Sequence, residues 1–348
     1  MLLVSSSSML SRGRKASTLS KLLLAAAIGA PLSLFAAPRA SAVILADQWW
    51  RNKSAPSGSL AGSGWQWTGD WGAFTGIPIA RNYFITASHV GGSVGQSLTL
   101  NGHSYRTTAM FDDPNSDLRI WKTSSSFSSW APLYTANGEV NKTAVIIGRG
   151  TARGSDLDYN GWLHGWSWGA QDGRLSWGRN KLKSNSVFGG SGIGSMLSYT
   201  FDRSGHGDHV SDEGITSAGD SSGGVFVNSF GTWKLAGINY SVDGPFHKAG
   251  ESSSYLASLF DMGGFYKNGS YISNTSSDIP QAAYATRISS NQNWIRSVIG
   301  NSAAAQLADP SSSLVPEPTT AALLLGGGLG ALALRRRRRG RRFGRARS

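Results

Sequence analysis

Short runs of β-branched and aromatic residues, separated by Gly, Asn, Asp and Ser, fill the chain between Val43 and Leu314. Runs of this kind predict strands, and the polar separators predict turns. Ser97–Leu100 is followed by Asn101-Gly102, a dipeptide that strongly favours a two-residue hairpin turn, and then by a second run, Ser104–Thr108. Thr143–Gly148 predicts another strand. The body of the chain is therefore predicted to be all-β.

The first 42 residues have a different pattern. Basic residues precede an apolar stretch over 22–37, and Ala40-Ser41-Ala42 offers small residues at a cleavage position. This order is typical of a secretory signal peptide. We expect signal peptidase to remove residues 1–42 and to leave Val43 as the first residue; an uncleaved anchor is the alternative.

The C-terminal end carries a second apolar run. Pro316, Glu317 and Pro318 precede the sixteen residues 319–334, which an arginine block from Arg335 follows. The run is short for a membrane span of ~20 residues, and the arginines favour a cytoplasmic end. The pattern resembles the PEP-CTERM sorting signal of Gram-negative bacteria. The resemblance implies a sorting signal over 315–348 after a linker at 301–314. It also implies cleavage by an exosortase-type enzyme and release to the cell surface or an exopolysaccharide matrix; an ordinary tail anchor is the alternative.

Charge and cysteine content limit the classes of protein to which residues 43–314 can belong. The net charge of +13 comes from the two ends, because residues 43–314 hold 19 basic and 19 acidic residues. A neutral body gives no reason to expect nucleic-acid binding. The chain has no cysteine, so its core must hold the fold without disulfides. Roughly 270 residues are enough for one large domain or two small barrels.

The candidate chemistry centres on the glycine-rich stretch 219–224, GDSSGG. Glycines permit a tight turn and leave nearby N–H groups uncovered, as an oxyanion-binding site requires. A serine needs a base to become a nucleophile. His89 ends an apolar run, and Asp117 stands before the alternating run 118–122, so the chain supplies His, Asp and Ser in that order.

These motifs resemble those of the trypsin-like serine proteases. ITASHV at 85–90 is similar to the TAAHC segment, SDLRIWK at 116–122 to DIALLKL, and GDSSGG to GDSGGP; residues 284–295 resemble the YTRV…WI ending. The resemblance covers 43–300. It implies a double six-stranded β-barrel of the chymotrypsin type with a short C-terminal helix and a linker near 123–129. It also implies a serine endopeptidase that cleaves protein or peptide substrates through an acyl-enzyme, with no cofactor or metal.

The resemblance also implies the roles of residues. Ser221 is the nucleophile, His89 the base and Asp117 the residue that orients it, while the N–H groups of Gly219 and Ser221 bind the oxyanion. Ser222 stands where the family has glycine. Aligned from the Gly-Gly side, Ser222 would be the nucleophile instead; the ungapped alignment favours Ser221.

Specificity and activation follow from the same comparison. Ile215, six residues before Ser221, corresponds to the floor of the specificity pocket, which predicts apolar or small side chains before the scissile bond because a buried unpaired cation is costly. A shift of register would bring Glu213 into the pocket instead. In the family, Asp220 pairs with a freed N-terminus; docking of the Val43 amine there is the less favoured alternative.

Two further stretches carry weaker signals. Four tryptophans between Tyr159 and Asn180 form either an aromatic surface for sugars or peptides, or, as we favour, packing within second-barrel strands. These are Trp162, Trp166, Trp168 and Trp177. The polar stretch 252–277 predicts a surface loop. The alternative to an endopeptidase is an inactive trypsin-fold module that binds a surface or exopolysaccharide matrix.

Overall fold

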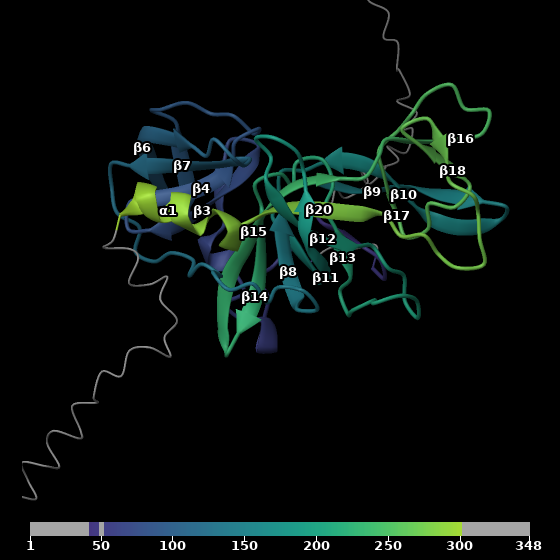
Figure 1. Cartoon of the computed structure of the whole chain (residues 1–348), viewed down its shortest axis with the longest axis horizontal. Coiled ribbons are helices and arrows are strands. Elements are labelled where there is room, and N and C mark those ends of the chain that lie inside the picture. The colour runs from purple at the N-terminus through teal and green to yellow at the C-terminus, as the bar shows by residue number, and fades with distance from the viewer. Residues whose placement is uncertain (1–41, 49–51, 301–348) are drawn as a thin grey trace, which may run out of the picture. The chain divides into compact units, whose positions relative to one another are not determined.

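The computed structural model describes residues 42–48 and 52–300 (Figure 1). The predicted signal peptide up to Ser41, the predicted linker at 301–314 and the predicted sorting signal with Pro316, Glu317 and Pro318 lie outside the described residues. Within them, no helix is both long and apolar enough to cross a membrane.

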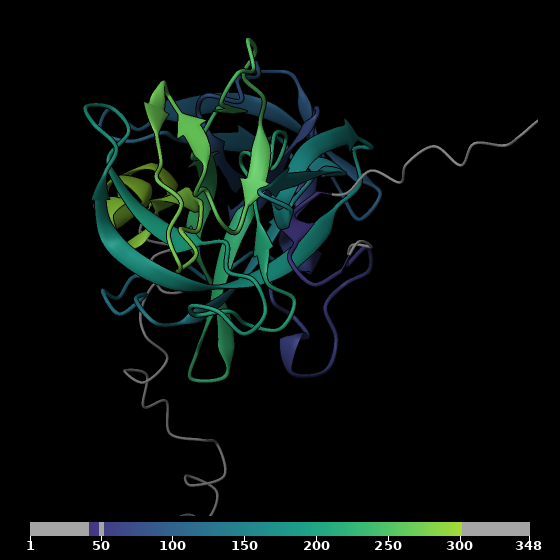
Figure 2. The ribbon, with the colours of Figure 1, turned by 90° about the vertical axis from the view of Figure 1, so that its right-hand side faces the viewer.

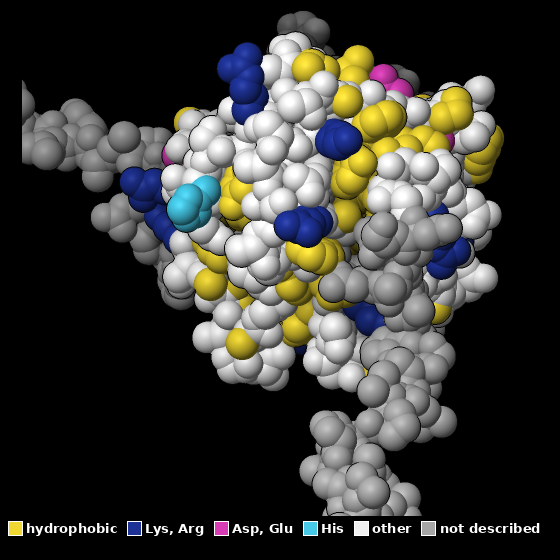
Figure 3. All heavy atoms as spheres, turned by 90° about the vertical axis from the view of Figure 1, so that its left-hand side faces the viewer, with side chains coloured by type: hydrophobic (Ala, Val, Ile, Leu, Met, Phe, Trp, Pro, Cys, Tyr) yellow, Lys and Arg dark blue, Asp and Glu magenta, His cyan; other side chains and the backbone are white. Residues whose placement is uncertain are grey.

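The first half of the described chain closes into a six-stranded antiparallel barrel. Its strands are β2 (Gly69–Trp71), β3 (Phe74–Ala80), β4 (Tyr83–Ala87), β5 (Ser97–Leu100), β6 (His103–Asp112) and β7 (Leu118–Thr123), in the order β2-β3-β4-β7-β6-β5. The predicted hairpin is confirmed, since β5 pairs with β6 across Asn101 and Gly102, both at positive φ (51° and 78°). Figure 3 looks onto this end of the molecule, where Lys and Arg side chains are scattered rather than gathered in one patch.

The second half closes a second barrel of six strands. These are β8 (Thr143–Gly148), β11 (Ser176–Phe188), β12 (Ser195–Thr200), β14 (Gly224–Ser229), β15 (Thr232–Val242) and β20 (Ala282–Arg287), in the order β11-β12-β20-β15-β14-β8. The 3₁₀ turn η3 (Ser289–Asn291) leads into the short helix α1 (Gln292–Ile299). The predicted double six-stranded barrel of the chymotrypsin type with a short C-terminal helix is confirmed.

One hydrophobic core joins the two barrels. Ile77 and Ile85 of the first barrel and Phe226 and Ile238 of the second belong to the same buried cluster, which also includes Ile295 of α1. Burial of large apolar side chains is the main stabilising contribution to a fold, so this shared core fixes one barrel against the other. Any site at their junction is thereby held by packing rather than by disulfides.

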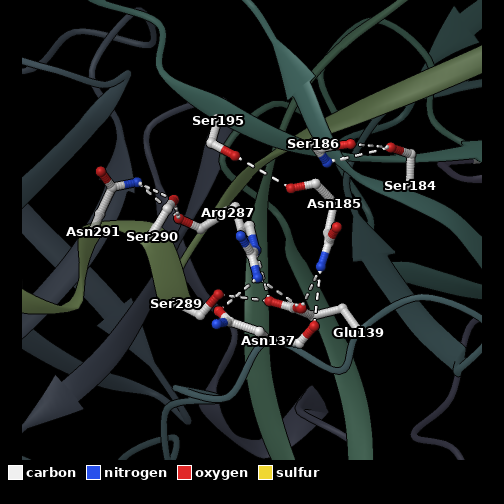
Figure 4. Close-up of polar contacts among 10 residues, drawn as sticks. All are labelled: Asn137, Glu139, Ser184, Asn185, Ser186, Ser195, Arg287, Ser289, Ser290 and Asn291. Carbon is white, nitrogen blue, oxygen red and sulfur yellow. Dashed lines mark hydrogen bonds and ion pairs between the residues drawn. The ribbon is translucent and has the colours of Figure 1, made fainter.

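A polar cluster fastens the inter-barrel connection to the end of β20 (Figure 4). The buried carboxylate of Glu139 accepts hydrogen bonds from Arg287 Nε (2.8 Å), Ser289 Oγ (2.6 Å) and Asn185 Nδ2 (3.0 Å). Burial alone would raise the pKa of Glu139, but these hydrogen bonds outweigh it and hold the pKa below its usual 4.5. Glu139 therefore remains ionised at neutral pH and anchors the chain ahead of α1.

Two small sheets extend from the second barrel, and Figure 2 looks onto them. One contains β9 (Thr151–Tyr159), β10 (Trp162–Gln171) and β17 (Ala257–Leu259); the other contains β16 (Phe246–Lys248), β18 (Phe265–Lys267) and β19 (Ser270–Tyr271). The prediction of a surface loop over 252–277 is thus wrong in part. Strands of two or three residues are too short to show a period, yet Leu259 and Phe265 build a separate buried cluster there.

Candidate active site

His89 and Asp117 meet because two paired strands bring them to the same edge of the first barrel. Ala87, the last residue of β4, lies opposite Leu118, the first residue of β7. The residues just beyond these two therefore come together, and His89 Nδ1 lies 2.6 Å from Asp117 Oδ2. The backbone N–H of His89 and the hydroxyl of Ser88 donate to Asp117 Oδ1 at 3.0 and 2.8 Å.

This geometry prepares the imidazole to accept a proton. Asp117 is buried, whereas the His89 side chain is 37% exposed. When Nδ1–H donates to the carboxylate, the neutral ring leaves Nε2 as an acceptor. Asp117 in turn has both oxygens engaged by donors, so it is held in one orientation. The pair has the arrangement of a general base and the residue that orients it.

The serine-bearing turn is fixed around the buried carboxylate of Asp220. The N–H groups of Gly150 and Ser217 donate to its two oxygens, each at 2.7 Å, and Asp220 N donates back to Ser217 O at 3.1 Å. Despite these donors, burial raises the pKa of Asp220 to about 6. Within this turn, which covers residues 217–224, Gly219 has a φ of 92° that favours glycine.

The two adjacent serines in this turn have different environments. Ser221 is partly exposed and its hydroxyl has no hydrogen-bond partner among the described residues. Ser222 is completely buried, and its Oγ accepts a hydrogen bond from Ala87 N at 3.0 Å. Ala87 lies two residues before His89, so the turn lies against the His89 segment. Of the two serines, Ser221 is therefore the one that is partly exposed and has an unengaged hydroxyl.

The backbone amides on the two sides of Asp220 make no hydrogen bond to other described residues. The N–H groups of Gly219 and Ser221 donate to no acceptor in the described part of the chain, while Ser222 N and Gly223 N donate to backbone carbonyls. Free amides beside a nucleophile can bind a developing oxyanion. Gln171, which the sequence did not single out, packs over this turn: a Cβ on Gly219 would lie 2.1 Å from Gln171 Nε2.

Tyr240 of β15 is a second neighbour that sequence reasoning missed. Its ring packs edge-on against His89, with ring centroids 5.5 Å apart and an interplanar angle of 86°. Burial and the negative charge of Asp117 both raise the pKa of Tyr240. No motif marks this tyrosine in the sequence, because its contact with His89 arises only when the two barrels come together.

The two specificity candidates lie at or beside β13 (Gly214–Ile215), which pairs with β1 (Ile44–Leu45). Ile215 is completely buried in the second-barrel core. Glu213 accepts hydrogen bonds from Asn180 Nδ2 (2.8 Å) and Asp202 N (3.2 Å), and burial raises its pKa to about 9. A carboxyl that is neutral at pH 7 and already engaged does not provide a counter-charge for a substrate cation.

The N-terminal segment reaches the serine-bearing turn. Ala42, Val43 and Ile44 are completely buried, and Val43 N lies 3.4 Å from Asp220 Oδ1. The geometry thus agrees with the less favoured alternative from the sequence. Cleavage before Val43 would convert this backbone nitrogen into an ammonium beside the Asp220 carboxylate.

The tryptophans divide into packing residues and one exposed residue. Trp166 and Trp177 are buried, and Trp168 Nε1 donates to Ser258 Oγ at 3.0 Å, so these three side chains are packed. Only Trp177 belongs to a strand of the second barrel, because Trp166 and Trp168 lie in β10 of the adjoining three-stranded sheet. Trp162, next to the turn between β9 and β10, is 73% exposed. It lines a cavity of about 360 Å³ together with polar residues that include Asn274 and Asp261.

The chain matches no family model, and its sequence matches no curated protein. Among solved structures it is similar to the passenger domain of the plasmid-encoded toxin, an autotransporter enterotoxin of enteroaggregative Escherichia coli (16% identity, TM-score 0.39). That match covers 64% of this chain and only 21% of the toxin chain. It is also similar to mouse neuropsin, a serine protease (15% identity, TM-score 0.42, covering 69% of this chain and 96% of neuropsin). Kallikrein-related peptidase 10 in complex with Zn²⁺ matches at 15% identity and a TM-score of 0.39, over 68% of this chain and 96% of the peptidase. At these identities, a shared activity does not follow from the likeness.

Proposed function

We propose that this protein is an exported serine endopeptidase that hydrolyses peptide bonds through His89, Asp117 and Ser221. The observation that carries the proposal is the 2.6 Å contact between His89 Nδ1 and Asp117 Oδ2, next to a turn that contains the partly exposed Ser221. A base, an orienting carboxylate and a nucleophile in one place are the requirements for acyl transfer without a cofactor.

The reaction would use each group in turn. Ser221 Oγ attacks the carbonyl carbon of the peptide bond while its proton passes to His89 Nε2, and Asp117 stabilises the imidazolium. The N–H groups of Gly219 and Ser221 stabilise the negative charge on the carbonyl oxygen. The C–N bond then breaks as His89 returns the proton to the leaving nitrogen. Water, activated by the same histidine, hydrolyses the ester of Ser221.

A fluorophosphonate reagent tests this proposal directly, because it phosphonylates a serine only where a base activates the hydroxyl. We expect a covalent adduct that peptide mapping assigns to Ser221 and that Ser221→Ala abolishes. Cleavage of casein by the wild-type protein and not by the variant would extend the result to peptide bonds. An adduct on Ser222, or none at all, would contradict the proposal.

A second function is favoured by the exposed Trp162. Its indole borders a polar cavity in the extension of the second barrel, and an aromatic face beside hydrogen-bonding groups suits a sugar ring. On this alternative the protein is an inactive trypsin-fold module that binds an exopolysaccharide matrix. Binding of Ser221→Ala protein to exopolysaccharide, with loss on Trp162→Ala and without any fluorophosphonate adduct in the wild type, would favour this function.

The ends of the chain support a proposed route to the cell surface. Signal peptidase would cleave before Val43, and an exosortase-type enzyme would cleave near Pro316, Glu317 and Pro318. In a Gram-negative bacterium this would give a transient C-terminal anchor and then release to the surface or matrix. Mass spectrometry of the exported protein should find neither end, and alanines at 316–318 should leave it in the membrane. Finding Arg335 to Ser348 on the exported form would refute this route.

A further inference from the structure

Ser222 has a backbone conformation that ordinarily favours glycine. Its φ is 68°, in the left-handed region that residues with a Cβ rarely adopt. Strained residues of this kind persist only where surrounding interactions compensate for them. Here the side chain is completely buried and its hydroxyl is engaged, so a specific interaction accompanies the strain.

The donor to that hydroxyl is the backbone N–H of Ala87, which makes no hydrogen bond to a neighbouring strand of the described structure. Ser88, the next residue, donates to Asp117 O across the β4–β7 pair, and successive residues of a strand point their N–H groups to opposite sides. Ala87 N therefore faces away from β7, toward β3. The pairing of β4 with β3 has already ended at Ile85. Ser222 Oγ, at 3.0 Å, thus satisfies a buried amide that the strand ladder leaves unpaired.

This contact crosses from one barrel to the other at the site itself. Ser222 follows Ser221, and Ala87 precedes His89 by two residues. Within the described part of the chain, it is the hydrogen bond that ties the serine-bearing turn, residues 217–224, directly to the segment 83–91 that carries His89. The nucleophile and its base belong to different barrels, so their separation depends on contacts of this kind.

We propose that Ser222 is a positioning residue, which sets Ser221 against His89 through the hydrogen bond from Ala87 N to Ser222 Oγ. The inference rests on the proposed serine-hydrolase function. It assigns to Ser222 a role that glycine, lacking a hydroxyl, cannot perform. It also explains why a residue with a Cβ occupies this strained backbone position.

Two substitutions separate the hydroxyl from the backbone strain. Ser222→Gly removes both, whereas Ser222→Ala removes the hydroxyl and keeps a Cβ at positive φ. Both would be made in the full chain and purified from the exported fraction. Ser176→Ala is the matched control, because Ser176 is a buried serine whose Oγ has no hydrogen-bond partner in the described structure.

The measurements are the rate of fluorophosphonate acylation, kcat and KM on a peptide substrate, and hydrogen exchange of the segment 83–91 by mass spectrometry. For both Ser222 variants we expect acylation and kcat to fall about tenfold, which corresponds to about 1.4 kcal/mol of transition-state stabilisation. KM should change less than twofold and exchange in 83–91 should accelerate. The adduct should still map to Ser221, and Ser176→Ala should behave as the wild type.

The outcomes distinguish this inference from the proposed function. If the wild-type protein forms no adduct, both the proposed function and this inference are contradicted. A wild-type protein that reacts, together with Ser222→Gly that acylates at the same rate, would overturn the inference alone. A loss confined to Ser222→Ala would also overturn it, because strain rather than the missing hydroxyl would then be the cause.

Discussion

The nitrogen of Val43 decides how the buried Asp220 is compensated. In the unprocessed chain it is a peptide N–H, 3.4 Å from Asp220 Oδ1. Burial then raises the pKa of Asp220 to about 6 from 3.8, so ionising this carboxyl at neutral pH costs about 3 kcal/mol of folding free energy. A chain that begins at Val43 places an ammonium at the same position. An opposite charge this close lowers a carboxyl pKa by about 1–3 units, which offsets most of that cost.

The perturbation is one residue of chain length. Residues 43–314 would be compared with residues 42–314, each released from a fusion without extra residues. Retaining Ala42 moves the ammonium by about one Cα–Cα step of ~3.8 Å and restores a peptide bond at Val43. Because breaking a buried ion pair typically costs about 3–5 kcal/mol, we expect the longer chain to be less stable by about 3 kcal/mol at pH 7.

Urea unfolding across pH and titration of the reactive serine are the assays. In the longer chain, the raised pKa of Asp220 contributes stability that is full below pH 3.8 and is lost as the pH rises through about 6. In the shorter chain, the pair is complete at neutral pH; it is lost in acid as Asp220 becomes protonated, and in base as the amine deprotonates above its unfolded pKa of ~8. The shorter chain should therefore be the more stable one at neutral pH and should react with more fluorophosphonate per molecule.

A second substitution tests whether the difference in stability comes from the ion pair with Asp220 or from the extra residue Ala42. On an Asp220→Asn background the two chains should have equal stability, because the carboxylate that distinguishes them is gone. Equal unfolding free energies of the two chains with Asp220 intact would refute the reasoning. So would a difference that persists with asparagine, since it would arise from Ala42 itself.

Three further predictions rest on single side chains. His89→Ala should abolish fluorophosphonate reactivity, because no side chain then accepts the proton of Ser221; reactivity near the wild-type rate would show that His89 is not the base. Burial raises the pKa of Glu213 to about 9, so this carboxyl contributes stability that is full below pH 4.5 and is lost as the pH rises through about 9. In Glu213→Gln, the unfolding free energy should therefore decline less between pH 4.5 and about 9 than in the wild type. The same variant should leave cleavage specificity in a peptide library unchanged and without preference for Arg or Lys; a basic preference that Glu213→Gln abolishes would show that Glu213 lines the pocket. Arg287→Ala should destabilise the protein by about 3–5 kcal/mol in urea at pH 7, because it leaves the buried Glu139 charge uncompensated. The control Arg119→Ala, at a pair whose partner Asp112 is 48% exposed, should cost less than about 1 kcal/mol, and equal costs would argue against the role of burial.

Local signals in the sequence were sufficient for much of the barrel framework. The Asn101-Gly102 turn forms because both residues tolerate positive φ, and the apolar run Thr143–Gly148 forms β8 with the predicted bounds. Both features depend on neighbours in the chain, which is the information that a pattern contains. The order of His89, Asp117 and Ser221 could be predicted for the same reason, because His89 follows a recognisable run while Asp117 and Ser221 each precede one.

Features that depend on contacts between distant segments of the chain could not be predicted from local sequence patterns. Tyr240 contacts His89 from the second barrel, and Ser222 contacts Ala87 across 135 positions of sequence. The elevated pKa of Glu213 comes from burial, which a residue list does not reveal. The strands within 246–271 were missed because they are too short to impose a period of two on the sequence.

The site therefore depends on how the two barrels are held together. With no cysteine in the chain, that task falls to the shared core and to a few polar contacts. Gly224, at the end of the serine-bearing turn, packs so closely on Ile77 of the first barrel that a Cβ on Gly224 would lie 2.7 Å from Ile77 Cδ1. A contact this tight leaves little freedom for one barrel to shift on the other. The backbone strain at Ser222 is tolerable for the same reason: the core fixes the position of Ala87, and the hydroxyl then only has to reach it.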